Sequence, residues 1–135
     1  MTLRPLSSTV SASAQLSPDV MPALAASGVA RVISNRPDGE DPGQPTAAVM
    51  EAAALQAGLA FAWIPVSGLP GPDQVAAVAA LLADGVPTVM FCRSGMRSAA
   101  AWAMAERLKG TDAADLREAA AAAGYDLGRG SAVDC

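Results

Sequence analysis

Short apolar runs alternate with longer amphipathic segments along this chain of 135 residues. The runs at 29–33, 59–66 and 86–92 are mostly apolar, are bounded by glycine or proline, and predict strands. A weaker run at 8–14 predicts a short edge strand. Because helical segments separate these runs, the pattern predicts an α/β fold. Its mainly parallel central sheet has four to five strands joined by right-handed crossovers, with helices on both faces.

Capping residues and glycines predict where the helices begin and end. The expected starts are Ser17-Pro18-Asp19, Thr46, Asp73, Arg97 and Thr111-Asp112, and the expected stops are Gly28, Gly58, Gly85, Gly110 and Gly124. Asp73 is interpreted as a capping residue, and the tail from Tyr125 onward as coil. Trp63 and Trp102 are expected in the core.

Composition narrows the possible functions. Apolar residues make up 52% of the chain, the net charge is −4, and there is one lysine and no histidine. No basic run predicts nucleic-acid binding, and no apolar stretch reaches the ~20 residues of a membrane span. The absence of histidine excludes serine–histidine triads and histidine metal sites. We therefore expect a single domain over 1–135 that is cytoplasmic, with no metal, no cofactor and no nucleic-acid or membrane partner.

The most informative stretch follows the last predicted strand and reads Cys92-Arg93-Ser94-Gly95-Met96-Arg97-Ser98. A tight loop between a strand and a helix forms an anion site, because the first helical amides have no partners within the helix. A cysteine beside two arginines is favoured as a thiolate, which is the nucleophilic form. Cys92 and Arg97 are therefore candidate catalytic residues, and the backbone of 93–98 is a candidate substrate cradle. The alternative for Cys92 is an ordinary buried cysteine.

Other residues of this loop have two interpretations each. Arg97 is either an anion clamp or a first-turn surface arginine, and the clamp is favoured because a cation at a helix N-terminus opposes the dipole. Arg93 either contacts substrate or is solvated. Gly95 permits a turn that other residues resist. Ser98 either donates to the Cys92 sulfur or stabilises the start of the helix.

Loops at 35–45, 67–72 and 92–97 all follow predicted strands and should meet at one edge of the sheet. The long first loop is typical of a functional segment. Asn35 and Arg36 are candidates to hold the anionic end of a substrate. The alternative is a surface ion pair of Arg36 with Asp38 or Glu40. Cys135 either resolves a modified Cys92 or is incidental.

Residues 92–98 resemble the active loop of rhodanese-type sulfurtransferases. The wider chain resembles a bacterial family, the phosphatase-like domain that also occurs fused to β-lactamase-like hydrolases. The matching stretches are 33–40, 42–45, Ala53 with 58–59, 64–66, the loop itself, 102–103 and 123–127. The resemblance implies the fold of cysteine-dependent phosphatases, with a rhodanese-like fold as the alternative.

The loop length separates the activities that this resemblance implies. Four residues lie between Cys92 and Arg97, whereas cysteine phosphatases have five, and a shorter loop suits a single added sulfur atom. Phe91 replaces the usual phosphatase histidine, and the loop at 67–72 contains no acid. Asp38, Glu40 or Asp41 would have to act as the general acid of a phosphatase.

We therefore predict a thiol sulfurtransferase that works through a Cys92 persulfide. Its donor would be thiosulfate, another small sulfur-containing anion, or a persulfide such as glutathione persulfide, and its acceptor a thiol or another thiophile. The first alternative is a cysteine-dependent phosphatase with a phosphocysteine intermediate. The second is a non-catalytic redox or persulfide sensor.

Overall fold

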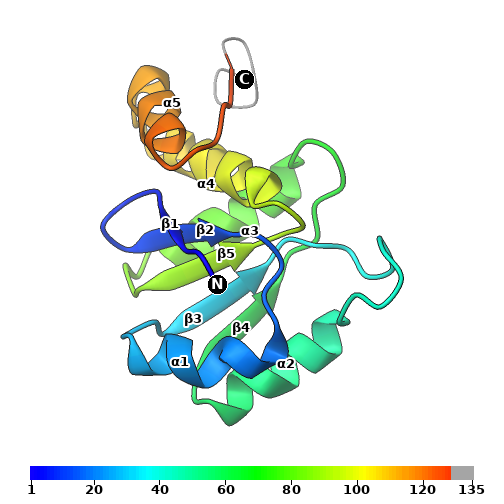
Figure 1. The fold of residues 1–135 in the computed structure, drawn as a ribbon. Coiled ribbons are helices and arrows are strands. Elements are labelled where there is room, and N and C mark those ends of the chain that lie inside the picture. Colours follow the sequence, from blue (N-terminus) through cyan, green and yellow to red (C-terminus); the bar gives the residue numbers. More distant parts are fainter. Residues whose placement is uncertain (129–135) are drawn as a thin grey trace.

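A five-stranded sheet forms the centre of the computed structural model, which describes residues 1–128 (Figure 1). The strand order is β1-β2-β5-β3-β4, and the strands are β1 (Arg4–Pro5), β2 (Val10–Ser13), β3 (Arg31–Ser34), β4 (Ala60–Trp63) and β5 (Thr88–Phe91). All neighbouring strands are parallel except β1 and β2, which are antiparallel. The predicted α/β class and mainly parallel sheet are thus confirmed.

The N-terminal end of the sheet differs from the prediction. β2 lies between β1 and β5, so it is an interior strand and not the expected edge strand. β1 was not predicted, because two residues are too few to show an alternating pattern and one of them is Pro5. β1 instead occupies this edge.

Local capping chemistry sets the helix starts. The helical elements are η1 (Pro18–Val20), α1 (Met21–Ala26), α2 (Ala47–Gln56), α3 (Pro72–Leu82), α4 (Met96–Leu108) and α5 (Ala113–Ala122). The side chains of Ser17, Thr46 and Asp112 accept hydrogen bonds from first-turn amides of η1, α2 and α5, as predicted.

The predicted capping role of Asp73 is wrong. Gly71 is the N-cap of α3, and Asp73 lies inside its first turn. The Gly71 amide donates to Gln74 Oε1 at 2.7 Å, so a glutamine side chain closes this helix start. Asp73 still complements the positive end of the helix dipole.

Alternate residues of the central strands face two separate cores. Val89 and Phe91 pack with Val32 against α1 and α2, whereas Met90 packs with Ile33 against α3, α4 and α5. Figure 1 shows α1 and α2 on one face of the sheet and α4 and α5 on the other. No helix within residues 1–128 is long and apolar enough to cross a membrane.

The two tryptophans have different environments. Trp102 on α4 is 3% exposed and belongs to the core, as predicted. Trp63 is 46% exposed, so its predicted core position is wrong. It ends the edge strand β4, and its indole Nε1 donates to the Arg36 carbonyl at 2.9 Å.

The parallel register aligns the ends of three strands. Ser34 of β3 and Ser13 of β2 both pair with Phe91 of β5, and Ser34 also pairs with Trp63 of β4. The chain therefore leaves β3, β4 and β5 at the same edge. Of the C-terminal tail, residues 125–128 lack regular structure, as expected, and Cys135 lies outside the described residues.

Candidate active site

Cys92 lies directly after β5, at the base of the loop that leads into α4. Its amide donates to Ser13 O at 3.3 Å, which fixes the residue against β2. Gly95, at a φ of +97°, turns the chain so that its own amide lies 3.1 Å from Cys92 Sγ. The left-handed conformation favours glycine there. The result is a backbone N–H directed at the sulfur, which stabilises a thiolate. Cys92 itself is 0% exposed.

Arg97, in the first turn of α4, connects all three loops. Its Nη1 donates to Val66 O after β4 at 2.7 Å, and to Glu40 Oε2 at 2.7 Å. Its Nη2 donates to Glu40 Oε1 at 2.8 Å, so the ion pair is bidentate. The Glu40 hydrogen bonds raise the pKa of Arg97, and the nearby Cys92 raises it further, against the opposing effect of burial. The predicted convergence of the loops is confirmed.

Two arginines hold Glu40 as a carboxylate. Its hydrogen bonds with Arg97 and then Arg36 outweigh the raising effect of burial and lower its pKa from 4.5 to about 2. The carboxylate is therefore ionised. Its charge stabilises two guanidinium groups, so the general-acid role that the sequence left open for Glu40 stays a prediction.

Arg36 is tied down by neighbouring side chains. Its Nε lies 3.0 Å from Glu40, its Nη2 lies 2.6 Å from Asp41, and its Nη1 donates to Gln15 at 3.0 Å. Arg36 thus forms the ion pair with Glu40 that was the alternative to substrate binding, although Arg36 is 5% exposed and not at the surface. The predicted contact of Arg36 with substrate is corrected, because its guanidinium stabilises the loop after β3. The Asp38 carboxylate instead accepts from the Ala47 amide of α2.

Asn35 and Ser98 form a buried bridge beneath the loop. Ser98 Oγ donates to Asn35 Oδ1 at 2.8 Å, and Asn35 Nδ2 donates to Ile64 O at 2.9 Å. Both residues are 0% exposed. The predicted substrate contact of Asn35 is therefore wrong, and so is a bond from Ser98 to the Cys92 sulfur. The pair stabilises the start of α4 by linking it to β3 and β4.

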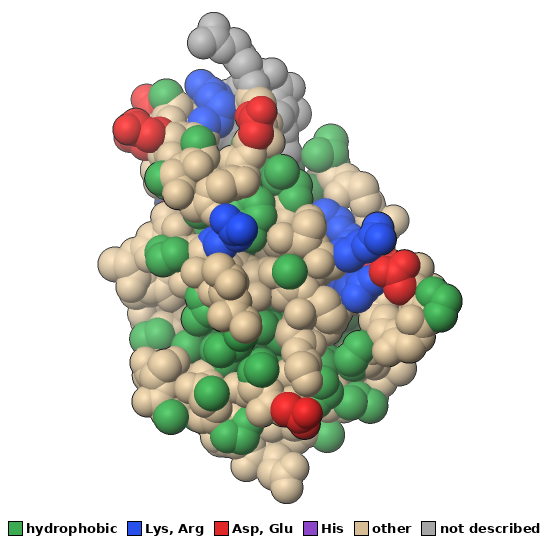
Figure 2. All heavy atoms as spheres, viewed as in Figure 1, with side chains coloured by type: hydrophobic (Ala, Val, Ile, Leu, Met, Phe, Trp, Pro, Cys, Tyr) green, Lys and Arg blue, Asp and Glu red, His purple; other side chains and the backbone are tan. Residues whose placement is uncertain are grey.

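The outer residues of the loop face solvent. Arg93 is 70% exposed at its side chain, and its Nε lies 3.2 Å from Asp41. Ser94 is exposed, and its Oγ accepts from the Met96 amide at 3.3 Å. Met96 is 39% exposed. Figure 2 shows basic side chains beside an acidic one on the side where these loops lie in Figure 1. Arg93, Ser94 and Met96 therefore stay candidate substrate contacts.

Sequence reasoning missed three contributors to this site. The Gln15 side-chain oxygen accepts from Arg36, and the Gln15 backbone N–H donates to Arg93 O. The Val66 carbonyl accepts from Arg97, and Tyr125 contacts the loop from the far end of the chain. A carbonyl gives no residue-specific signal, and a lone glutamine or tyrosine gives a weak one. Within residues 1–128, no three cysteine, aspartate or glutamate side chains cluster as metal ligands would.

This geometry is that of a cysteine-phosphatase-like α/β domain: a cysteine at the base of a strand–loop–helix, with an arginine fixed over it. The chain belongs to the family described as "Beta-lactamase hydrolase-like protein, phosphatase-like domain", whose model matches residues 2–109. This agrees with the family resemblance seen in the sequence.

Curated relatives and solved structures agree with this assignment. A beta-lactamase hydrolase-like protein of Xylella fastidiosa (strain Temecula1) is 37% identical over 105 residues, covering 76% of this chain and 24% of the relative. The protein of the same description from Agrobacterium fabrum is 33% identical over 109 residues, covering 78% of this chain and 25% of the relative. The chain thus spans about a quarter of the length of these relatives.

Among solved structures, a Neisseria meningitidis protein described as a candidate phosphatase has a TM-score of 0.80 and 27% identity, covering 94% of this chain and 92% of its own. P. aeruginosa TpbA in complex with pTyr has a TM-score of 0.64 and 23% identity, covering 98% and 85%. The second likeness shows the fold alone. Together they support the phosphatase-like fold over the rhodanese-like alternative.

Replacing Glu40 with glutamine should remove a pH-dependent part of the stability. A carboxyl whose pKa is lowered from 4.5 to about 2 stabilises the fold above its unfolded pKa, and this contribution is lost as the pH falls through 2. Urea unfolding from pH 7 to pH 2 should show Glu40→Gln less stable than the parent at neutral pH, with the difference shrinking below pH 4.5. Glu51→Gln, on exposed α2 surface, is the control. A constant difference at all pH values would contradict the ion-pair assignment.

Proposed function

We propose that this chain hydrolyses phosphoric monoesters, with Cys92 as the nucleophile. The observation that supports this most directly is the pairing of a sulfur that accepts the Gly95 amide with an arginine oriented by a carboxylate. Such a site offers a thiolate for attack on phosphorus, together with fixed N–H donors for the oxygens that become more negative. The phosphatase-like family and the candidate phosphatase of N. meningitidis support the same activity.

The proposed reaction has two displacements. The Cys92 thiolate attacks the phosphorus, the ester P–O bond breaks, and the leaving oxygen takes its proton from solvent water. Water then attacks the phosphocysteine, the S–P bond breaks, and phosphate leaves as the thiolate re-forms. Arg97 and the free amides of the loop stabilise the phosphoryl oxygens in both steps. Esters of acidic alcohols such as phenols are the expected better substrates, because Glu40 is held as a carboxylate.

One observation favours a second candidate, the sulfurtransferase that the sequence predicted. The loop has four residues between Cys92 and Arg97, a spacing that suits one added sulfur atom. In that reaction the thiolate attacks the sulfane sulfur of thiosulfate, the S–S bond breaks and sulfite leaves. A thiolate acceptor then removes the sulfur from the persulfide. None of the comparisons supports this activity, so it ranks second. A non-catalytic thiol sensor is the third possibility.

Parallel assays on one preparation distinguish these functions. Initial rates would be measured with p-nitrophenyl phosphate, and with thiosulfate plus cyanide as donor and acceptor. We expect release of p-nitrophenol that is lost in Cys92→Ser and unchanged in Cys135→Ser. Turnover of thiosulfate alone would favour the sulfurtransferase, and turnover of neither substrate by a folded protein would favour the sensor.

Arg97→Lys should reduce phosphatase kcat/KM by roughly a hundredfold, since lysine keeps the charge but loses the planar fork that Glu40 orients. The matched control is Arg107→Lys near the end of the same helix, which should leave kcat/KM unchanged. Steady-state kinetics at saturating and limiting substrate would measure both. An equal rate for Arg97→Lys and the parent would rule out bidentate contact with the phosphoryl group.

A further inference from the structure

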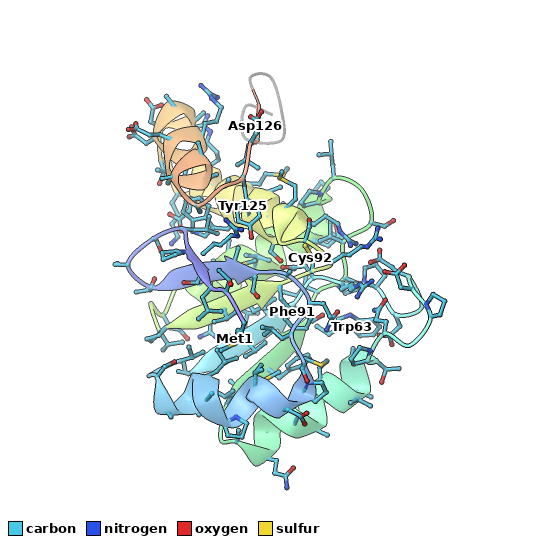
Figure 3. All side chains as sticks on the ribbon, viewed as in Figure 1. Met1, Trp63, Phe91, Cys92, Tyr125 and Asp126 are labelled. Atoms are coloured by element: carbon cyan, nitrogen blue, oxygen red, sulfur yellow. The ribbon has the colours of Figure 1, made fainter. Side chains whose placement is uncertain are left out.

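The segment after α5 returns to the catalytic loop, beyond the part of the chain that the family model matches. Residues 123–127, here called the C-terminal strap, follow α5 and include three buried side chains, Ala123, Tyr125 and Leu127. They pack in the core shared by α3, α4 and α5. Figure 3 shows Tyr125 close to the start of α4 and to Cys92. The strap thus places the chain's one tyrosine beside the loop.

Arg4 on β1 holds the strap in place. Its Nη1 donates to Ala123 O at 3.1 Å, and its guanidinium carbon lies 5.8 Å from the centre of the Tyr125 ring. A cation at this distance from an aromatic ring is attracted to it. The backbone at Gly124 passes so close to Arg4 that an added Cβ would lie 2.5 Å from Nη1. β1, the strand that was not predicted from the sequence, therefore holds the C-terminal strap through Arg4.

Tyr125 contacts one particular peptide unit of the loop. Its hydroxyl donates to Ser94 O at 3.4 Å, and it occupies the space into which a side chain at Gly95 would extend. That peptide unit also contains the Gly95 N–H, which lies 3.1 Å from Cys92 Sγ. A trans peptide is planar, with its C=O and N–H on opposite sides. Holding the oxygen therefore fixes the direction of the N–H.

We propose that Tyr125 is a positioning residue, whose hydroxyl and ring hold the Ser94–Gly95 peptide so that its N–H stays directed at Cys92. If this peptide rotated, the Ser94 carbonyl would turn toward the sulfur and repel both a thiolate and an anionic substrate. Burial raises the pKa of Tyr125, so the hydroxyl keeps the proton that it donates, although Arg4 acts in the opposite direction. The inference rests on the proposed role of Cys92 as a nucleophile.

The test measures the reactivity of Cys92 directly, without requiring turnover. In a Cys135→Ser background, the rate of Cys92 alkylation by iodoacetamide would be followed against pH for the parent and for Tyr125→Phe. Phenylalanine keeps the ring, its packing and the contact with Arg4, and removes only the hydroxyl. The bond at 3.4 Å is longer than the typical value of about 2.8 Å, so we expect a fall of roughly two- to tenfold at neutral pH. The half-maximal rate should move to higher pH.

Leu127→Ala is the matched control, because it loosens the packing of the strap but leaves the hydroxyl in place. We expect it to lower the urea midpoint while its alkylation profile keeps the same half-maximal pH. Superimposable profiles for Tyr125→Phe and the parent would overturn the proposal. So would an equal shift in both variants, which would indicate a general loosening.

Phosphatase kinetics on the same variants separate this inference from the proposed function. A shifted alkylation profile in a protein that hydrolyses no phosphomonoester would support the positioning role and contradict the phosphatase. Hydrolysis of a phosphomonoester, with an alkylation profile that is unchanged in Tyr125→Phe, would support the phosphatase and contradict the positioning role. If the protein hydrolyses phosphomonoesters and also shows the shifted profile, we expect Tyr125→Phe to lower kcat/KM, because the rotated Ser94 carbonyl would repel both the thiolate and the anionic substrate.

Discussion

The guanidinium of Arg97 is the point at which the loops of this molecule are joined. It binds Glu40 from the loop after β3 and the Val66 carbonyl from the loop after β4, and it lies beside the thiol that follows β5. Parallel strands bring these loops to one edge of the sheet, where a multidentate cation can connect all three. Arg36, which is more deeply buried than Arg97, likewise contacts several side chains at once: Glu40, Asp41 and Gln15. Glu40 and Asp41 therefore offset part of the positive charge of three arginines, Arg36, Arg93 and Arg97.

The site is largely shielded from solvent. Cys92 is 0% exposed, and the side chains of Arg97 and Glu40 are 20% and 28% exposed. Under the proposed function, an anionic substrate would compete with Glu40 for the guanidinium of Arg97. The bidentate ion pair thus orients the arginine and also occupies it. The Gly95 amide is fixed independently, from the side of the C-terminal strap.

The sequence was informative where a local pattern decides the structure. Apolar runs located four of the five strands, and Ser17, Thr46 and Asp112 marked helix starts because their side chains satisfy first-turn amides. The sequence was misleading where a contact with a residue distant in the chain decides the position of a side chain. Asn35 and Arg36 look available to an anion, yet Asn35 bonds the buried Ser98 hydroxyl and Arg36 pairs with Asp41 of its own loop. Trp63 has a large apolar side chain but is exposed, because it ends an edge strand. Tyr125 contacts Ser94 of the loop, 31 residues earlier in the sequence, and no local pattern predicts that contact.

The central claim is that the thiol of Cys92 accepts the phosphoryl group of a monoester. The most direct measurement mixes the protein with excess p-nitrophenyl phosphate, quenches it within one turnover, and maps the modified peptide by mass spectrometry. We expect a phosphoryl group on Cys92 that disappears on longer incubation without substrate. Release of p-nitrophenol with no phosphorylated Cys92 peptide, or with undiminished release from Cys92→Ser, would contradict it.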